Sequence, residues 1–250
     1  MVGHLLLRGM IIGALAGLLA FGFARVFGEP AVEHSIALEE AASQAKGQAP
    51  EPEVVSREIQ AGIGLFTGIV TFSAALGGLF SLAFAFTYGR LTKLSPRGTA
   101  ALLALAGFVA LVLVPGLKYP PTPPAVGNPE TIAHRTELFF FMLALSLAMV
   151  AFAVALVRRL WSGLGGWNAA IIGVVTYVVI VGVLLLALPE INEVPEDFPA
   201  TLLWQFRVAS IGVQAVLWTV LGLAFGYVAE HYLASVPPRG EPVRTPAHAR

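Results

Sequence analysis

The sequence predicts an all-α protein, a polytopic transmembrane helical bundle with about six membrane-spanning helices and both termini in the cytoplasm. Hydrophobic residues make up 57% and charged residues 12% of the 250 residues, and the mean hydropathy is +0.79. A soluble domain, which must cover itself with polar surface, is far less apolar. Six windows each provide the roughly 20 apolar residues that a membrane-crossing helix needs. The lipid membrane is therefore the expected environment of the chain.

The first span is expected near residues 6–27. Arg8 followed by an apolar run is also how a signal peptide begins. This run, however, is long and keeps Arg25 at its far end. Three glycines recur along it at four-residue spacing: Gly9, Gly13 and Gly17. Such spacing lets helix backbones approach closely in lipid, so we interpret the run as a retained span.

A polar segment over residues 28–61 follows, with seven glutamates and a middle rich in Gly, Gln, Ala and Pro. Part of it, around Glu33–Gln44, is expected to form a short surface helix. The second span is expected near 62–88, where Gly64 and Gly68 repeat the spacing of the first span. We interpret this pair as a packing face, with a hinge as the alternative.

Four further spans are expected near 99–117, 138–157, 169–188 and 208–232. Short basic loops separate the second span from the third and the fourth from the fifth. Gly222 and Gly226 form another packing pair in the last span. Residues 235–250 are rich in Pro and Arg and too poor in apolar residues to pack. They are expected to form a disordered cytoplasmic tail after a membrane domain of residues 1–234.

Charged residues are distributed unevenly between the two sides of this topology. The N-terminus, the second and fourth loops and the tail together hold nine basic and two acidic residues. The other three loops hold six basic and thirteen acidic residues. Because basic residues in short loops stay on the cytoplasmic side, both termini are placed there and the acidic loops face outward.

Two proline-rich polar stretches, residues 114–137 and 188–207, are the expected places for chemistry. In the first, Asn128 is a good N-cap and the following proline a good first helical residue, so a helix is expected to begin there. Three side chains then share one helix face at i, i+4 and i+7: Glu130, His134 and Glu137. Carboxylate and imidazole suit a divalent first-row cation. The alternative is a solvated first turn whose acids favour the positive helix end.

The second stretch carries a dense set of oxygen ligands: Glu190, Asn192, Glu193, Glu196 and Asp197. Such density attracts cations by raising their local concentration as well as by coordination. Pro195 and Pro199 restrict the backbone, which favours a shaped cation vestibule. The alternative is an acidic outer loop that only obeys the topology.

Arg207, Ser210 and Gln214 are expected on one stripe of the last span. A charge inside hydrocarbon costs roughly 2.5–3.5 kcal/mol on insertion scales, so Arg207 should face the bundle or extend to the outer surface. Glu137 or Glu190 is the expected partner.

Several function classes are excluded by missing signals. The chain contains no cysteine, so a thiolate metal or redox centre is not expected. No phosphate-binding Gly-Lys-Ser/Thr loop, no Gly-x-Ser-x-Gly elbow and no His-Glu-x-x-His motif occurs. Basic residues are spread along a cytoplasmic rim, so no nucleic-acid partner is expected. The sequence thus does not predict an enzyme.

Three strings carry a resemblance to a known family: LLLRGMIIGALAGLLAFGFARVFGEPAVEHSIALEEA, LKYPPTPPAVGNPETIAHRT and LPEINEVPEDFPATLLWQFRVAS. Over nearly its whole length the chain resembles the predicted cobalt transporter subunit CbtA, a multi-spanning protein of bacterial membranes. The resemblance implies cobalt uptake across the cytoplasmic membrane. It also implies a small one-span partner, CbtB, that bears a His-containing metal segment.

The resulting hypothesis is an inner-membrane subunit that passes Co²⁺ inward, with Co²⁺ as substrate and no permanently bound cofactor. The expected metal-contacting residues are Glu130, His134, Glu137, Glu190, Glu193, Glu196 and Asp197. One alternative is a non-transporting membrane scaffold that binds a partner protein. Another is a transporter of a different divalent metal or of a corrinoid, because an N/O site also accepts Ni²⁺, Cu²⁺ or Zn²⁺.

Overall fold

A computed structural model describes residues 2–47 and 54–235, and all the secondary-structure elements in these ranges are helices. The α-helices are α1 (Val2–Phe23), α2 (Glu29–Ala45), α3 (Arg57–Ile59), α4 (Leu65–Thr87), α5 (Pro96–Phe108), α6 (Val114–Lys118), α7 (Ile132–Ala187), α8 (Ala200–Val220) and α9 (Gly226–Ser235). Four π-helical turns interrupt longer helices: η1 (Ala24–Gly28), η2 (Gln60–Gly64), η3 (Val109–Leu113) and η5 (Leu221–Phe225). A 3₁₀ turn, η4 (Pro129–Thr131), precedes α7.

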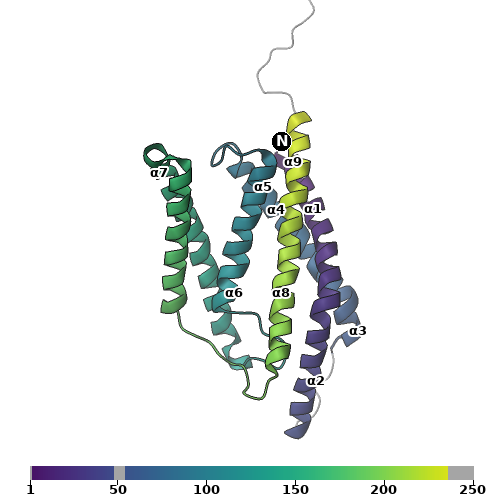
Figure 1. Cartoon of the computed structure of the whole chain (residues 1–250). Coiled ribbons are helices and arrows are strands. Elements are labelled where there is room, and N and C mark those ends of the chain that lie inside the picture. The colour runs from purple at the N-terminus through teal and green to yellow at the C-terminus, as the bar shows by residue number, and fades with distance from the viewer. Residues whose placement is uncertain (1, 48–53, 236–250) are drawn as a thin grey trace, which may run out of the picture.

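Within the described ranges, five continuous helices are long and apolar enough to cross a membrane: Val2–Ala45, Arg57–Thr87, Pro96–Lys118, Pro129–Ala187 and Ala200–Ser235. The fourth reverses direction at Gly165, whose φ of 74° is in the left-handed region that glycine adopts without steric cost. Figure 1 shows its two halves as antiparallel rods. Six helical rods therefore cross the bundle, which confirms the prediction of about six spans.

The two ends of the bundle differ in the sign of their charge. Val2, the α4–α5 connection, the turn of α7 and the end of α9 lie at one end, which we call the basic end (Figure 1). The connections 119–128 and 188–199 lie at the opposite, acidic end together with α2. This arrangement agrees with the alternation read from the sequence. The tail expected over 235–250 lies outside the described residues except for Ser235.

The first helix is longer than expected, because α1, η1 and α2 run on as one helix from Val2 to Ala45. The expected surface helix around 33–44 is thus the continuation of the first span. Pro30 does not end this helix. A proline lacks the backbone N–H that a helix interior uses, but it is tolerated in a first turn, and the π turn η1 places Pro30 in the first turn of α2. Pro115 follows η3 at the start of α6 in the same way.

The spans near 138–157 and 169–188 also extend beyond their expected limits. Helix α7 begins at Ile132, and its two halves meet at Gly165, so the loop expected between them is almost entirely helical. A single glycine is enough for this reversal, since the conformation at φ 74° turns the chain without further loop residues.

Helices α1 and α4 pack with their backbones in contact. A Cβ atom on Gly9 would lie 2.4 Å from the Gly77 carbonyl oxygen, and one on Gly13 would lie 2.2 Å from the Ser73 carbonyl oxygen. Gly17 faces the side chain of Ser73. The expected packing face of the first span is therefore confirmed, and no larger residue fits at these positions without a shift of the helices.

The partner face on α4 is not the one that the sequence suggested. A Cβ on Gly68 would meet nothing within 4 Å, and Gly64 approaches only Ile59 of its own helix. The prediction of a Gly64/Gly68 packing face is wrong, because spacing alone does not say which side of a helix meets its neighbour. The pair in the last span is confirmed: a Cβ on Gly222 would lie 2.7 Å from the Ala104 side chain, and Gly226 approaches Arg97.

The core is shared unequally among the helices. The main cluster unites α1, α4, α5 and α8–α9 through side chains such as Leu5, Phe84, Leu217 and Phe225. A second, smaller cluster joins α7 to α6 through Val114, Met142 and Val181. The α7 hairpin therefore lies at the periphery of the bundle, attached mainly through α6.

Candidate functional site

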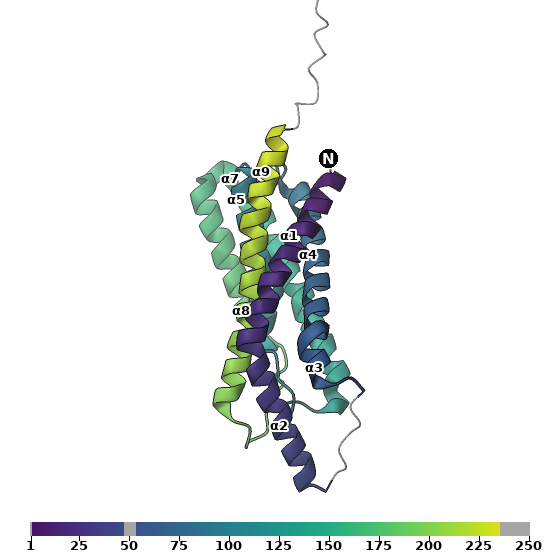
Figure 2. The ribbon, with the colours of Figure 1, turned by 90° about the vertical axis from the view of Figure 1, so that its right-hand side faces the viewer.

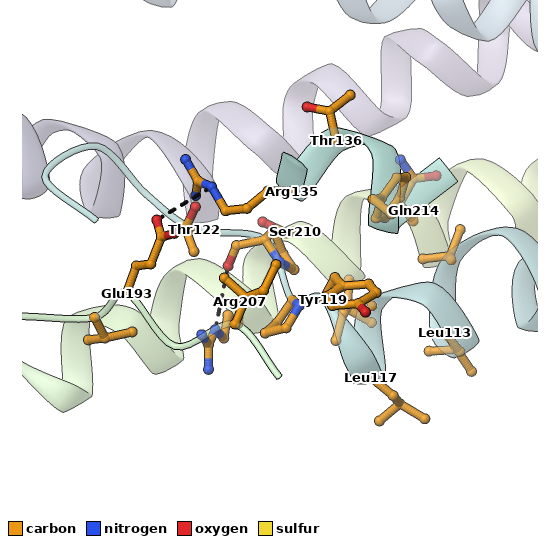
Figure 3. A pocket seen from close by; sticks show the side chains of 18 of the residues that line it. Leu113, Leu117, Tyr119, Thr122, Arg135, Thr136, Glu193, Arg207, Ser210 and Gln214 are labelled. Carbon is orange, nitrogen blue, oxygen red and sulfur yellow. Dashed lines mark hydrogen bonds and ion pairs between the residues drawn. The ribbon is translucent and has the colours of Figure 1, made fainter. Parts of the chain in front are cut away.

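A cavity of about 620 Å³ lies at the acidic end, between α6, the start of α7, the 188–199 connection and α8. Its polar lining includes Tyr119, Thr122, Arg135, Thr136, Asn192, Glu193, Arg207, Ser210 and Gln214 (Figure 3). Apolar side chains, among them Leu113, Leu117, Phe139 and Ile211, complete the wall. The cavity thus joins the two proline-rich stretches that the sequence singled out.

The end of α6 is fixed to the 188–199 connection and to the end of α7. The Lys118 ammonium donates a 2.7 Å hydrogen bond to the Leu185 carbonyl oxygen. The Tyr119 hydroxyl donates to the Pro189 carbonyl oxygen at 3.1 Å. Prolines 120 and 121 follow and have no backbone N–H to donate, so the chain leaves the helix in a stiff, non-helical segment that lines the cavity.

Asn128 begins the α7 region as the sequence predicted. Its side-chain oxygen accepts a 3.0 Å hydrogen bond from the backbone N–H of Glu130. The preceding residue, Gly127, has a φ of 113°, and a Cβ there would lie 2.5 Å from the Arg135 guanidinium. Gly127 is therefore required both by its backbone conformation and by the space that Arg135 occupies.

Glu193 connects this helix start to the opposite connection. Its carboxylate accepts hydrogen bonds from the Asn128 backbone N–H at 2.7 Å and from the Thr131 hydroxyl at 2.5 Å. The Arg135 Nε lies 3.4 Å from the same carboxylate. The Thr131 hydrogen bond, together with that from Asn128 and the charge of Arg135, lowers the pKa of Glu193. Because its pKa is lowered, Glu193 stays ionised at neutral pH, and its carboxylate has a structural role in joining these residues.

Arg207 faces the cavity from α8. Its Nε donates a long, 3.4 Å hydrogen bond to the Pro121 carbonyl oxygen. Ser210 and Gln214 line the same cavity one and two turns further along, so the stripe predicted on this helix is confirmed. The prediction of a carboxylate partner for Arg207 is not confirmed. The ion pairs among the described residues do not include Arg207, and the side chains of Glu137 and Glu190 are exposed. Arg207 is instead directed at the 119–122 segment, where the Pro121 carbonyl oxygen accepts its hydrogen bond.

Of the seven sequence-predicted metal residues, only Glu193 lines the cavity, and the seven do not form one cluster. Six of them are exposed: Glu130, His134, Glu137, Glu190, Glu196 and Asp197. The seventh, Glu193, is occupied by Thr131, Asn128 and Arg135. Among the residues that the structure describes, no three His, Cys, Asp or Glu side chains gather closely enough to hold a metal ion. Glu130 belongs to the 3₁₀ turn and His134 to the α-helix, so the uniform α-helical register assumed for them does not apply.

Sequence reasoning missed Arg135, Thr131 and Tyr119 as parts of this site. Only Arg135 had a local signal, since it is a charged residue just after the expected helix start. Thr131 and Tyr119 act on residues 62 and 70 positions away in the chain. No local pattern indicates contacts at such separations.

The fold and this site define a polytopic membrane protein with a charged, partly enclosed cavity at one end of a helical bundle. The chain belongs to the CbtA family, described as probable cobalt transporter subunit, whose model matches residues 2–230. Neither a curated protein nor a solved structure matches it. The chain is accordingly a membrane subunit of cobalt transport, with cobalt as substrate, and a subunit works with at least one further chain. Membership therefore places the chain with transporter subunits.

Proposed function

We propose that this chain passes Co²⁺ inward across the bacterial inner membrane, residues 1–234 acting as one membrane domain with the small one-span subunit CbtB as partner. The separation of charge along the bundle supports this proposal, because exposed carboxylates gather at the end that the positive-inside rule places outside. A cationic substrate is attracted to that end before it crosses.

In the first step of the proposed transport, the exposed acids of the 188–199 connection attract the cation. Glu190, Glu196 and Asp197 each present a carboxylate to solvent. A group of like charges at a surface raises the local concentration of a counter-ion and its rate of arrival. Glu193 contributes differently, since it holds the α7 start in place and its own charge is balanced by Arg135.

The first turns of the α7 region supply the proposed entry site, where the cation is first bound before it crosses. Glu130, His134 and Glu137 are exposed there and offer oxygen and nitrogen ligands suited to a first-row divalent cation. Water molecules and the histidine-bearing segment of the partner would complete the coordination. The membrane potential favours inward movement of cations by about 2.3 kcal/mol per charge per 100 mV.

Radioactive Co²⁺ uptake into sealed vesicles with an imposed potential tests the proposal. The chain is tested alone and with its small partner, in competition with Ni²⁺ and Zn²⁺. The triple variant Glu190→Gln, Glu196→Gln, Asp197→Asn should raise the apparent KM for Co²⁺ by roughly threefold or more at low salt, with Vmax little changed. The matched control neutralises three exposed acids on α2, namely Glu33, Glu39 and Glu40.

Uptake that depends on the chain and resists competition supports a cobalt-selective route. A control variant as impaired as the loop variant would contradict a role specific to the 188–199 connection. If no uptake occurs under any condition while the potential is intact, a non-transporting scaffold is the better description of this subunit.

A further inference from the structure

The cavity at the acidic end carries a positive charge, that of Arg207, which forms no ion pair among the described residues. Its charged lining residues are Arg135, Arg207 and Glu193. Glu193 lies 3.4 Å from Arg135 and neutralises it. Arg207 is left with a neutral carbonyl as its hydrogen-bond acceptor in the described part of the chain. A bare divalent cation in this space would meet a like charge, so the cavity suits an anion and not Co²⁺ itself.

Arg207 has unused hydrogen-bonding capacity. A guanidinium carries five N–H donors in a planar fork, and here one of them makes a bond of 3.4 Å to Pro121, longer than the usual 2.7–3.2 Å. Ser210 and Gln214 place a hydroxyl and an amide on the same wall (Figure 3). Such a fork matches the paired oxygens of a phosphate or carboxylate.

The mouth of the cavity is apolar and lies where the spans end. Trp204, one turn before Arg207 on α8, is 69% exposed, and Leu117 on α6 is 70% exposed. Ile211 continues the apolar surface along α8. Tryptophan at the end of a span is typical of the headgroup level of a bilayer. The site therefore combines a charged polar interior with a wall that faces hydrocarbon.

We propose that this cavity binds the phosphodiester headgroup of one anionic phospholipid from the leaflet at the acidic end. The single negative charge of the phosphodiester matches the single unbalanced charge of Arg207. The volume of about 620 Å³ accommodates a headgroup, while the acyl chains lie along Leu117 and Ile211. A free phosphate from the outer solution shares the same oxyanion chemistry, and the experiment separates the two sources.

The test is lipid binding by the purified full chain in detergent, measured by native mass spectrometry. Phosphatidylglycerol is titrated against phosphatidylcholine, which carries the same phosphate with no net charge. The unmodified chain should retain one phosphatidylglycerol in preference to phosphatidylcholine. Arg207→Gln should weaken this binding about tenfold, since a charge-assisted hydrogen bond is lost. Arg207→Lys keeps the charge and should retain part of the binding, which separates the role of the charge from a failure to fold.

Arg25→Gln is the matched control. Arg25 lies in η1, is 54% exposed, pairs with Glu29 at 3.9 Å and does not line the cavity. This variant removes one positive charge and should bind phosphatidylglycerol as the unmodified chain does. Equal retention of both lipids, or equal weakening by Arg25→Gln and Arg207→Gln, would overturn the proposal.

A second arm adds inorganic phosphate at millimolar concentration. Phosphatidylglycerol binding that persists in phosphate supports the lipid as occupant, because the acyl chains add contacts that phosphate lacks. Complete displacement by phosphate would instead make the occupant a soluble oxyanion and overturn the lipid assignment. Because the readout is bound lipid and not cobalt uptake, it is independent of the transport proposal.

Discussion

Glu193 accepts a 2.7 Å hydrogen bond from the backbone N–H of Asn128, although 65 positions separate the two residues in the chain. This bond fixes the 188–199 connection to the start of the α7 region and closes one side of the cavity. The same carboxylate is held by Thr131 and Arg135. One side chain therefore links the start of the α7 region to the 188–199 connection, in addition to the Tyr119–Pro189 and Arg207–Pro121 hydrogen bonds that also join the two proline-rich stretches.

Replacing Glu193 by Gln should loosen this connection. The uncharged amide loses the ion pair with Arg135 and weakens the bonds from Asn128 and Thr131. We expect faster hydrogen exchange of the Asn128 amide and a lower thermal unfolding temperature. Glu196→Gln, an exposed neighbour on the same connection, is the control and should change neither quantity. Unchanged exchange in Glu193→Gln would show that the Glu193 carboxylate does not hold the Asn128 amide in place.

The contribution of Glu193 should depend on pH in a defined direction. Its pKa is lowered in the folded protein, first by the Thr131 hydroxyl and then by the Asn128 N–H. The stabilisation is therefore complete above the ordinary pKa of a glutamate and is lost only as the pH falls through the lowered value. Protection of the Asn128 amide should persist at mildly acidic pH and disappear only as the pH falls through the lowered pKa of Glu193. Loss of protection already near pH 6 would contradict this assignment.

Enlarging Gly13 should separate α1 from α4. A Cβ at this position would lie 2.2 Å from the Ser73 carbonyl oxygen, a backbone atom that cannot move away alone. Gly13→Ala should lower the unfolding free energy by about 1–3 kcal/mol, the usual cost of overpacking. Gly68→Ala, where nothing lies within 4 Å, should leave stability unchanged or slightly raised. Thermal unfolding in detergent compares the two, and equal effects would argue against close backbone packing.

Removing the cation ligands of the proposed entry site at the start of α7 should impair cobalt uptake. In the double variant His134→Ala, Glu137→Gln, an imidazole and a carboxylate are lost from the first turns of α7, so less Co²⁺ is captured at low concentration. We expect a higher apparent KM for Co²⁺ in vesicle uptake. His231→Ala removes an exposed histidine from α9, at the basic end, and should leave uptake unchanged. Normal uptake by the double variant would exclude these residues from the route.

Much of the fold follows from local patterns in the chain. Apolar windows locate the spans because a bilayer imposes one length on every crossing helix. Asn128 and its proline locate a helix start because the orphan N–H groups there need an acceptor. Gly9, Gly13 and Gly17 identify a contact face because small residues are needed wherever backbones meet.

The site was less accessible to such reasoning. The role of Glu193 depends on a contact across 65 positions, and the orientation of Arg207 depends on how α8 is rotated in the bundle. The extension of the first span beyond Pro30 depends on a π turn, which has no simple sequence signal. These features arise from packing between distant segments, and a periodic pattern within one segment does not contain them.

The continuous helix from Val2 to Ala45 has a consequence for the shape of the outer surface. At 1.5 Å per residue its 44 residues span roughly 66 Å, about twice the 30 Å hydrocarbon thickness of a bilayer. Figure 2 shows its α2 part projecting past the neighbouring connections. This projecting helix holds the exposed acids Glu33, Glu39 and Glu40 away from the lipid. The exposed acids of α2 are thereby placed beyond the 119–128 and 188–199 connections, on the part of the acidic end that extends furthest from the bundle.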